Sequence, residues 1–133
     1  MNLFQLGNFT LHSGGKSRWI IDCRTLTTED WAALAVIAME RFNLRFNEVL
    51  GIPEGGLAFA NAMRPYAVSN SDAAVLIVDD VLTTGRSVTA HADSLAGEAI
   101  LQAHRENRQV LALVAFARGS IKDREVHAIW KLG

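Results

Sequence analysis

The chain has little that would tie it to a special environment. Only one of its 133 residues is cysteine, so no internal disulfide can form, and no cluster of cysteine and histidine suggests a metal site. The formal net charge is −1 without a basic block, which gives no support to nonspecific binding of nucleic acid. The longest apolar run, near Trp31–Met39, is far too short for a bilayer, and the first residues lack a basic-then-apolar signal. We expect a cytoplasmic protein with neither membrane nor nucleic-acid partners.

What the chain does have is the pattern of an α/β domain. Half of its residues are hydrophobic and 20% are charged, as in ordinary globular domains. Strands are expected at Phe9–His12, Arg18–Cys23, Glu48–Ile52, Val75–Val78, Gln109–Ala117 and Glu125–Lys131, and helices from Thr28, at Leu57–Met63 and at Ser87–Asn107. This alternation predicts a single domain over residues 1–133: a three-layer, mainly parallel sheet with a small N-terminal β-hairpin.

The most informative segment is Val75 to Ser87, which reads VLIVDDVLTTGRS. Its apolar, β-branched start predicts a parallel strand that is buried on both faces. Asp79 and Asp80 would then lie at the carboxyl end of that strand, where open α/β sheets place their ligands. The following turn leads into a helix, whose amino-terminal N–H groups and dipole favour an anion. The segment therefore suits a ligand that has hydroxyls on one side and a phosphate on the other, as a phosphorylated sugar does.

This segment resembles the phosphoribosyl pyrophosphate (PRPP) motif of type I phosphoribosyltransferases. The resemblance implies that Asp79 and Asp80 are the catalytic pair and hydrogen-bond the ribose hydroxyls. It also implies that the turn binds the 5-phosphate through Thr83, Thr84, Gly85, Arg86 and Ser87. The alternative is an ordinary buried strand with an acidic helix cap, although two adjacent acids exceed what a cap needs.

Other motifs that share parts of this string fit less well. A Walker A loop needs the pattern G-x-x-x-x-G-K-[ST], and Gly85-Arg86-Ser87 lacks both the earlier glycine and the lysine of that pattern. A haloacid-dehalogenase-type phosphatase needs a second acid where this chain has Val81. Response-regulator receivers carry paired acids on their first strand, but only 53 residues follow Asp80, too few for the rest of a receiver.

The N-terminal stretch Phe9–Arg24 resembles the start of orotate phosphoribosyltransferases, where a small hairpin builds the base pocket. The resemblance assigns base binding to His12, Ser13, Gly14, Lys16 and Trp19. His12 stands where the family usually has lysine, and histidine is a cation only below about pH 6.5. Ile20 stands at about the position where the family has a second aromatic residue. The alternatives are a solvent-facing His12 and a Trp19 that belongs to the core.

A glycine-rich loop follows the strand expected at Glu48–Ile52 and precedes a helix. Such a loop brings backbone N–H groups close to an anion. It resembles the pyrophosphate loop of the same family, and the resemblance assigns this role to Pro53, Glu54, Gly55 and Gly56.

Arg118 follows an apolar strand, where orotate enzymes carry an aspartate–arginine pair near the base. Ala117 replaces the acid. A guanidinium can bind the carboxylate of a base bidentately, so the resemblance adds Arg118 to the base-binding residues. The alternative is an arginine that faces water at a strand end.

One feature of the family is missing. Its members carry a further strand and a long basic loop, which closes over PRPP, between the pyrophosphate loop and the PRPP strand. Here only ten residues separate Met63 from Ala74, and they include one arginine but neither lysine nor histidine. Lid closure excludes water and brings cations to the leaving group. PRPP binding is therefore better supported than fast turnover.

Together these resemblances imply transfer of 5-phosphoribosyl from PRPP to a nucleobase, with an orotate-like pyrimidine favoured and pyrophosphate released. Magnesium would be bound through PRPP rather than directly by the protein, and a homodimer is expected. A second hypothesis is a non-catalytic PRPP or nucleotide sensor that has lost the lid. A third is a structural module that does not bind PRPP.

Overall fold

The computed structural model describes residues 2–11, 14–82, 95–118 and 126–132. Its main sheet has four parallel strands in the order β3 (Phe46–Gly51), β4 (Ala74–Leu82), β5 (Val110–Arg118) and β6 (Val126–Leu132). The apolar residues of the two central strands, β4 and β5, are almost all buried, as expected for strands covered on both faces. The predicted α/β class and parallel sheet are confirmed.

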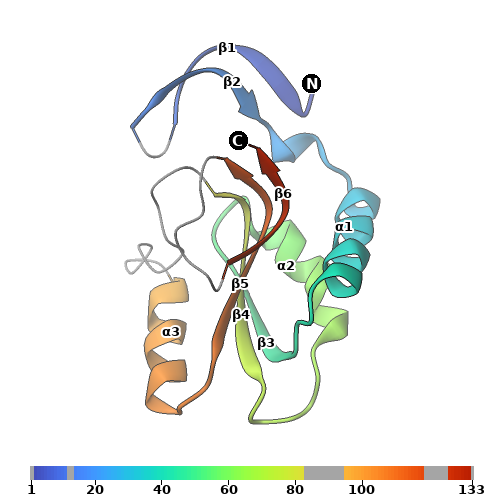
Figure 1. Ribbon diagram of the computed structural model, residues 1–133, viewed down its shortest axis with the longest axis vertical. Helices are drawn as coiled ribbons and strands as arrows, with labels where there is room; N and C mark the ends of the chain where they lie inside the picture. The colour runs from blue at the N-terminus through green and yellow to red at the C-terminus, as the bar shows by residue number, and fades with distance from the viewer. Residues whose placement is uncertain (1, 12–13, 83–94, 119–125, 133) are drawn as a thin grey trace.

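Helices cover both faces of this sheet (Figure 1). α1 (Thr28–Arg41) and α2 (Leu57–Met63) lie on one face, where their apolar residues join alternate residues of the strands in one core cluster. On the other face, α3 (Leu95–Arg105) buries Ile100 and Ala103 in a second cluster. The three-layer arrangement is thus confirmed.

α1 begins where the sequence predicted. The Thr27 side chain accepts a hydrogen bond from the backbone N–H of Asp30, and the Asp30 carboxylate accepts one from the backbone N–H of Thr27. This capping box satisfies two N–H groups at the helix start. Trp31, one turn later, is buried and stacks on Phe59 of α2 with 5.1 Å between ring centroids, so α1 and α2 are packed together at this point.

The predicted N-terminal hairpin is present, and it crosses over the carboxyl ends of the sheet strands (Figure 1). β1 (Phe4–Thr10) pairs antiparallel with β2 (Lys16–Ile21), and a 3-10 turn η1 (Cys23–Thr25) links β2 to α1. The prediction that the first strand starts at Phe9 was wrong by five residues. Gly7 and Asn8, which disfavour strands, are accommodated by a register shift between Leu6 and Phe9.

Other boundaries also differ from the predictions. β4 runs to Leu82 rather than ending at Val78, because Val81 and Leu82 stay paired with Phe116 and Ala117 of β5. The two acids therefore lie inside the last part of the strand rather than after it. The last strand is shifted by one residue from the expected Glu125–Lys131, and only residues 95–105 of the helix expected at Ser87–Asn107 are described as helical.

The connection from α2 to β4 is short. A 3-10 turn η2 (Arg64–Tyr66) follows α2, and no strand occurs in residues 67–73, all of which the structure describes. The N–H of Val68 donates to the carbonyl oxygen of Phe46 at 2.8 Å, so the connection touches the open edge of β3. Within the described ranges, no helix is long and apolar enough to cross a membrane.

Candidate active site

The acidic pair lies near the carboxyl end of β4, on the central part of the sheet. Oδ1 of Asp79 accepts the N–H of Asp80 at 2.8 Å, and Oδ1 of Asp80 accepts the N–H of Val81 at 2.7 Å. Both acids are half-buried. Burial raises the pKa of Asp79 to about 8, helped by a hydrogen bond with Asp80 and by the charge of that neighbour. Near neutral pH Asp79 therefore keeps its proton, as expected for a buried carboxyl group beside a second one.

The glycine-rich loop lies against this pair. It is joined to β4 by the N–H of Ile52, which donates to the carbonyl oxygen of Val78 at 2.8 Å. A side chain at Gly55 would meet the Asp80 carboxylate, with its Cβ 2.8 Å from Oδ1 and closer still to Oδ2. A Cβ at Gly56 would meet the carbonyl oxygens of Val78 and Ile52. Glycine is therefore required at position 56, and at position 55 any side chain would displace the Asp80 carboxylate.

The outer surface of this loop is open. Pro53, Glu54 and Gly55 are exposed, whereas Gly56 is buried at the start of α2. The structure thus brings together two segments that the sequence assigned to one ligand, the loop at residues 53–56 and the acids of β4. It places them at the same edge of the sheet.

Cys23 lies close enough to Asp79 and Asp80 for their charges to affect its thiol. The sequence did not indicate this proximity. Burial raises the pKa of its thiol to about 12, with further contributions from Asp80, Asp22 and Asp79. A thiol in this state is a poor nucleophile. The predicted strand Arg18–Cys23 was expected to end at Cys23, but this residue begins the 3-10 turn η1 instead.

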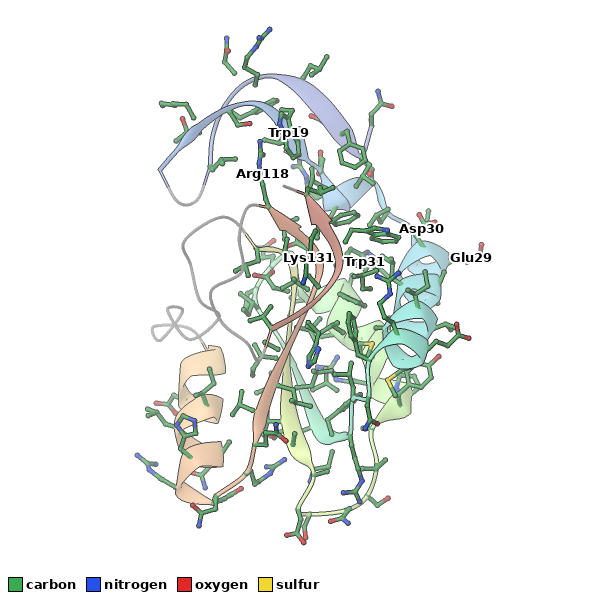
Figure 2. All side chains as sticks on the ribbon, viewed as in Figure 1. Trp19, Glu29, Asp30, Trp31, Arg118 and Lys131 are labelled. Atoms are coloured by element: carbon green, nitrogen blue, oxygen red, sulfur yellow. The ribbon has the colours of Figure 1, made fainter. Side chains whose placement is uncertain are left out.

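Arg118 connects the end of β5 with the hairpin (Figure 2). Its guanidinium carbon lies 3.4 Å from the centre of the Trp19 ring, and Nη1 donates to the carbonyl oxygen of Trp19 at 2.8 Å. Nη2 donates to Oγ of Ser17. Trp19 and Arg118, both assigned to base binding, are therefore brought together. Neither alternative holds: Arg118 does not simply face water, and the half-buried Trp19 is not a member of the core.

The other predicted hairpin residues are placed differently or lie outside the description. Nζ of the exposed Lys16 donates to Oγ1 of Thr10 at 2.7 Å. Since side chains alternate along a strand, Lys16 points to the face opposite that of Ser17 and Trp19. Gly14 is exposed in the hairpin turn, with a φ of +88° that favours glycine. His12 and Ser13 lie outside the described residues, as do Thr83, Thr84, Gly85, Arg86 and Ser87 of the predicted phosphate turn.

Comparison with known proteins gives a result at the level of structure. No protein-family model and no curated protein sequence matches the chain. Among solved structures, orotate phosphoribosyltransferase from Aeropyrum pernix is 22% identical with a TM-score of 0.69, over 98% of this chain and 88% of that one. The fold is that of the orotate phosphoribosyltransferases.

Two further similar structures agree with this phosphoribosyltransferase fold. Leishmania donovani UMP synthase is 20% identical with a TM-score of 0.66, and the match covers 98% of this chain but 34% of that larger protein. Orotate phosphoribosyltransferase from Mycobacterium tuberculosis H37Rv, in complex with inorganic phosphate, is 19% identical with a TM-score of 0.59, over 96% and 87% of the two chains. The similarity extends over nearly the whole chain, hairpin included.

Proposed function

We propose that the protein binds PRPP and transfers its 5-phosphoribosyl group to an orotate-like pyrimidine, with release of pyrophosphate. The observation that carries this proposal is the contact between Gly55 and Asp80. It joins a glycine-rich loop suited to a diphosphate with a carboxylate pair suited to sugar hydroxyls, at the ligand-binding edge of a parallel sheet.

In the proposed reaction the bond between C1 of the ribose and the pyrophosphate oxygen breaks, and a ring nitrogen of the base forms a new bond to C1. Pyrophosphate leaves with the electron pair, so positive charge develops on the ribose. Asp79 and Asp80 would orient the ribose hydroxyls and stabilise that charge. The loop Pro53–Gly56 would bind the pyrophosphate, and the turn Thr83–Ser87 the 5-phosphate.

The base would lie below the hairpin, near Trp19 and Arg118. A guanidinium stacked on an aromatic ring offers a planar, positively charged surface to a planar, anionic base, which favours a carboxylated pyrimidine. An orotate-like base brings an anionic ring nitrogen, so no protein group is needed to accept a proton from it. Threonine at position 83, where some purine-using members place an acid, agrees with this choice.

Magnesium fits this proposal as a companion of PRPP. The carboxylates of Asp79 and Asp80 are hard oxygen donors near the proposed ribose position, while among the described residues no cluster of three acids, cysteines or histidines could bind a metal ion by itself. When bound through PRPP, Mg²⁺ would neutralise charge on the pyrophosphate. The protein is further proposed to act in the cytoplasm as a homodimer.

The second candidate function, a PRPP sensor without catalysis, is favoured by the short connection from α2 to β4. Residues 64–73 contain one cation, Arg64, and its Nη1 is already bonded to Asn61 on α2. This segment cannot close over the site as a basic lid. Removal of one preorganised donor costs about 10²–10³ in rate.

Two measurements on one sample separate these functions. Isothermal titration with Mg·PRPP measures binding, and a pyrophosphate-release assay with orotate measures turnover. We expect clear binding and turnover at least about a hundredfold below a typical ~10 s⁻¹. Binding without release for any base would establish the sensor, whereas absence of binding would refute both functions and leave the structural module.

A further inference from the structure

The hairpin needs an attachment beyond its base. Among the described strands, β1 and β2 pair only with each other, and an isolated two-stranded hairpin is marginally stable. Its base is fixed by Asp22, which is 4% exposed and accepts hydrogen bonds from Nε2 of Gln5 (2.9 Å) and Nε of Arg24 (2.8 Å). Phe4 adds an edge-on contact with Phe116 of β5. These contacts hold one end of the hairpin and leave the rest of β2 to be held elsewhere.

Arg118 holds β2 at a second point. Its two terminal nitrogens donate to Oγ of Ser17 and to the carbonyl oxygen of Trp19, and its plane lies over the Trp19 ring. Hydrogen bonds from the guanidinium fork and stacking on a ring are both directional, so together they fix position and orientation. In the part of the chain that the structure describes, no other side chain of the four-stranded sheet hydrogen-bonds the hairpin.

The hairpin is built to receive this guanidinium. Ser17 and Trp19 have the same parity in β2 and therefore point to the same face. Oγ of Ser17 donates to the carbonyl oxygen of Trp19 at 2.7 Å and accepts the N–H of Trp19 at 3.2 Å. The hydroxyl is thereby oriented with its remaining lone pair available to Nη2 of Arg118. Burial lowers the pKa of Arg118, and the two oxygen acceptors and the ring offset this cost to the cation.

We propose that Arg118 is a positioning residue that latches the hairpin over the carboxyl edge of the sheet, through Ser17 and Trp19, before any ligand binds. The latch itself concerns the ligand-free protein. Its effect on catalysis rests on the proposed function: a loosened hairpin should raise KM for the base more than it lowers kcat, because the acids and the glycine loop are held independently of the hairpin.

Hydrogen exchange of the ligand-free protein tests the latch directly. Arg118→Gln should speed exchange of the β2 amides about tenfold or more, because opening of the hairpin then breaks fewer contacts. Amides of α1 and β3 should keep their wild-type rates and serve as the internal control. Ser17→Ala should act in the same direction, and the double variant should exceed Arg118→Gln by little, since both changes break the same contact. Arg18→Gln, an exposed arginine on the same strand, is the matched control and should change nothing.

A spectroscopic readout separates the latch from general loosening. With 5-fluorotryptophan incorporated, the three tryptophans give separate ¹⁹F signals, and Trp19→Phe assigns one of them. Arg118→Gln should move the Trp19 signal alone, and Arg118→Lys should move it less, because lysine keeps the charge but not the plane. Should Arg118→Gln fail to fold, Arg118→Lys and Ser17→Ala test the latch by the same two measurements, β2 amide exchange and the Trp19 ¹⁹F signal. Unchanged β2 exchange and an unchanged Trp19 signal in a folded variant would overturn the latch, whether or not the protein binds PRPP.

Discussion

The acidic pair and the Arg118–Trp19 contact lie at the same edge of the molecule but are held in different ways. Asp79 and Asp80 belong to a strand with parallel neighbours on both sides, and core clusters cover both faces of its sheet. Trp19 belongs to a hairpin outside that sheet, held by a few polar and aromatic contacts. The proposed sugar and diphosphate half is thus the rigid half, while the proposed base half depends on these few contacts for its position. This division predicts that changes near the acids affect PRPP, whereas changes in the hairpin affect the base.

The largest effect is expected from replacement of both acids of the pair. Asp79→Asn with Asp80→Asn should weaken Mg·PRPP binding by at least about thirtyfold, because one hydrogen bond to a charged carboxylate is worth roughly 1.5–3 kcal/mol and one to a neutral carboxyl roughly 0.5–1.5 kcal/mol. Asp72→Asn is the matched control, since Asp72 is exposed before the start of β4. Isothermal titration measures both variants, and wild-type affinity in a folded double variant would remove the basis for PRPP binding.

Two neighbouring glycines test the rigid half, because one substitution should mainly affect PRPP affinity and the other mainly stability. In Gly55→Ala the new methyl meets the Asp80 carboxylate, which can rotate away, so PRPP affinity should fall by about tenfold while Tm changes little. In Gly56→Ala the methyl meets backbone carbonyls that cannot move, so the free energy of unfolding should fall by about 1–3 kcal/mol. Thermal unfolding and titration of both variants distinguish the two. Equal effects on both readouts would contradict the close approach of Gly55 to Asp80.

Much of the rigid half could be predicted from sequence, because its signals are local. The apolar runs around Val75–Val78 and Val110–Phe116 identify the central strands, and Thr28, followed by Glu29 and Asp30, marks the start of α1. The extension of β4 to Leu82 could not be predicted, because it depends on pairing with a strand more than thirty residues away.

The hairpin half was less predictable for the same physical reason. Trp19 and Arg118 were each assigned to base binding, but their contact joins residues 99 positions apart, and nothing in either local sequence indicates the other. Lys16 points to the face opposite that of Trp19, and this could have been predicted from the alternation of side chains along β2. Gly7 and Asn8 obscured the start of β1, since the register shift that accommodates them leaves no simple alternating pattern.

Stability against pH tests the pair without any ligand. The folded pKa of Asp79 is about 8, above its unfolded value of 3.8, so the native state binds more protons between these values. The contribution of Asp79 to the free energy of unfolding should therefore fall as pH rises from about 4 to about 8. One unit of pKa shift corresponds to about 1.4 kcal/mol, so Asp79→Asn should be the more stable protein at pH 8.5 by about 1 kcal/mol or more. Chemical denaturation between about pH 4 and pH 8.5 measures the free energy of unfolding of both proteins. If the two values changed with pH in parallel, the raised pKa of Asp79 would be contradicted.

The smallest effect is expected from Asp22 at the base of the hairpin. Its contribution to stability increases with pH, opposite to that of Asp79. The hydrogen bond from the Arg24 side chain lowers the pKa of Asp22 below its usual value of 3.8, against the effect of burial. Asp22 therefore stabilises the fold above about pH 4, and this stabilisation is lost as pH falls through its folded pKa. Because the Arg24 side chain is 79% exposed, Asp22→Asn should cost no more than about 1 kcal/mol at pH 7. The difference from wild type should shrink towards zero at low pH, and exchange should quicken in β1 and β2 but not in β4. A loss that persists unchanged at pH 3 would mean that the shape of Asp22, rather than its charge, anchors the hairpin.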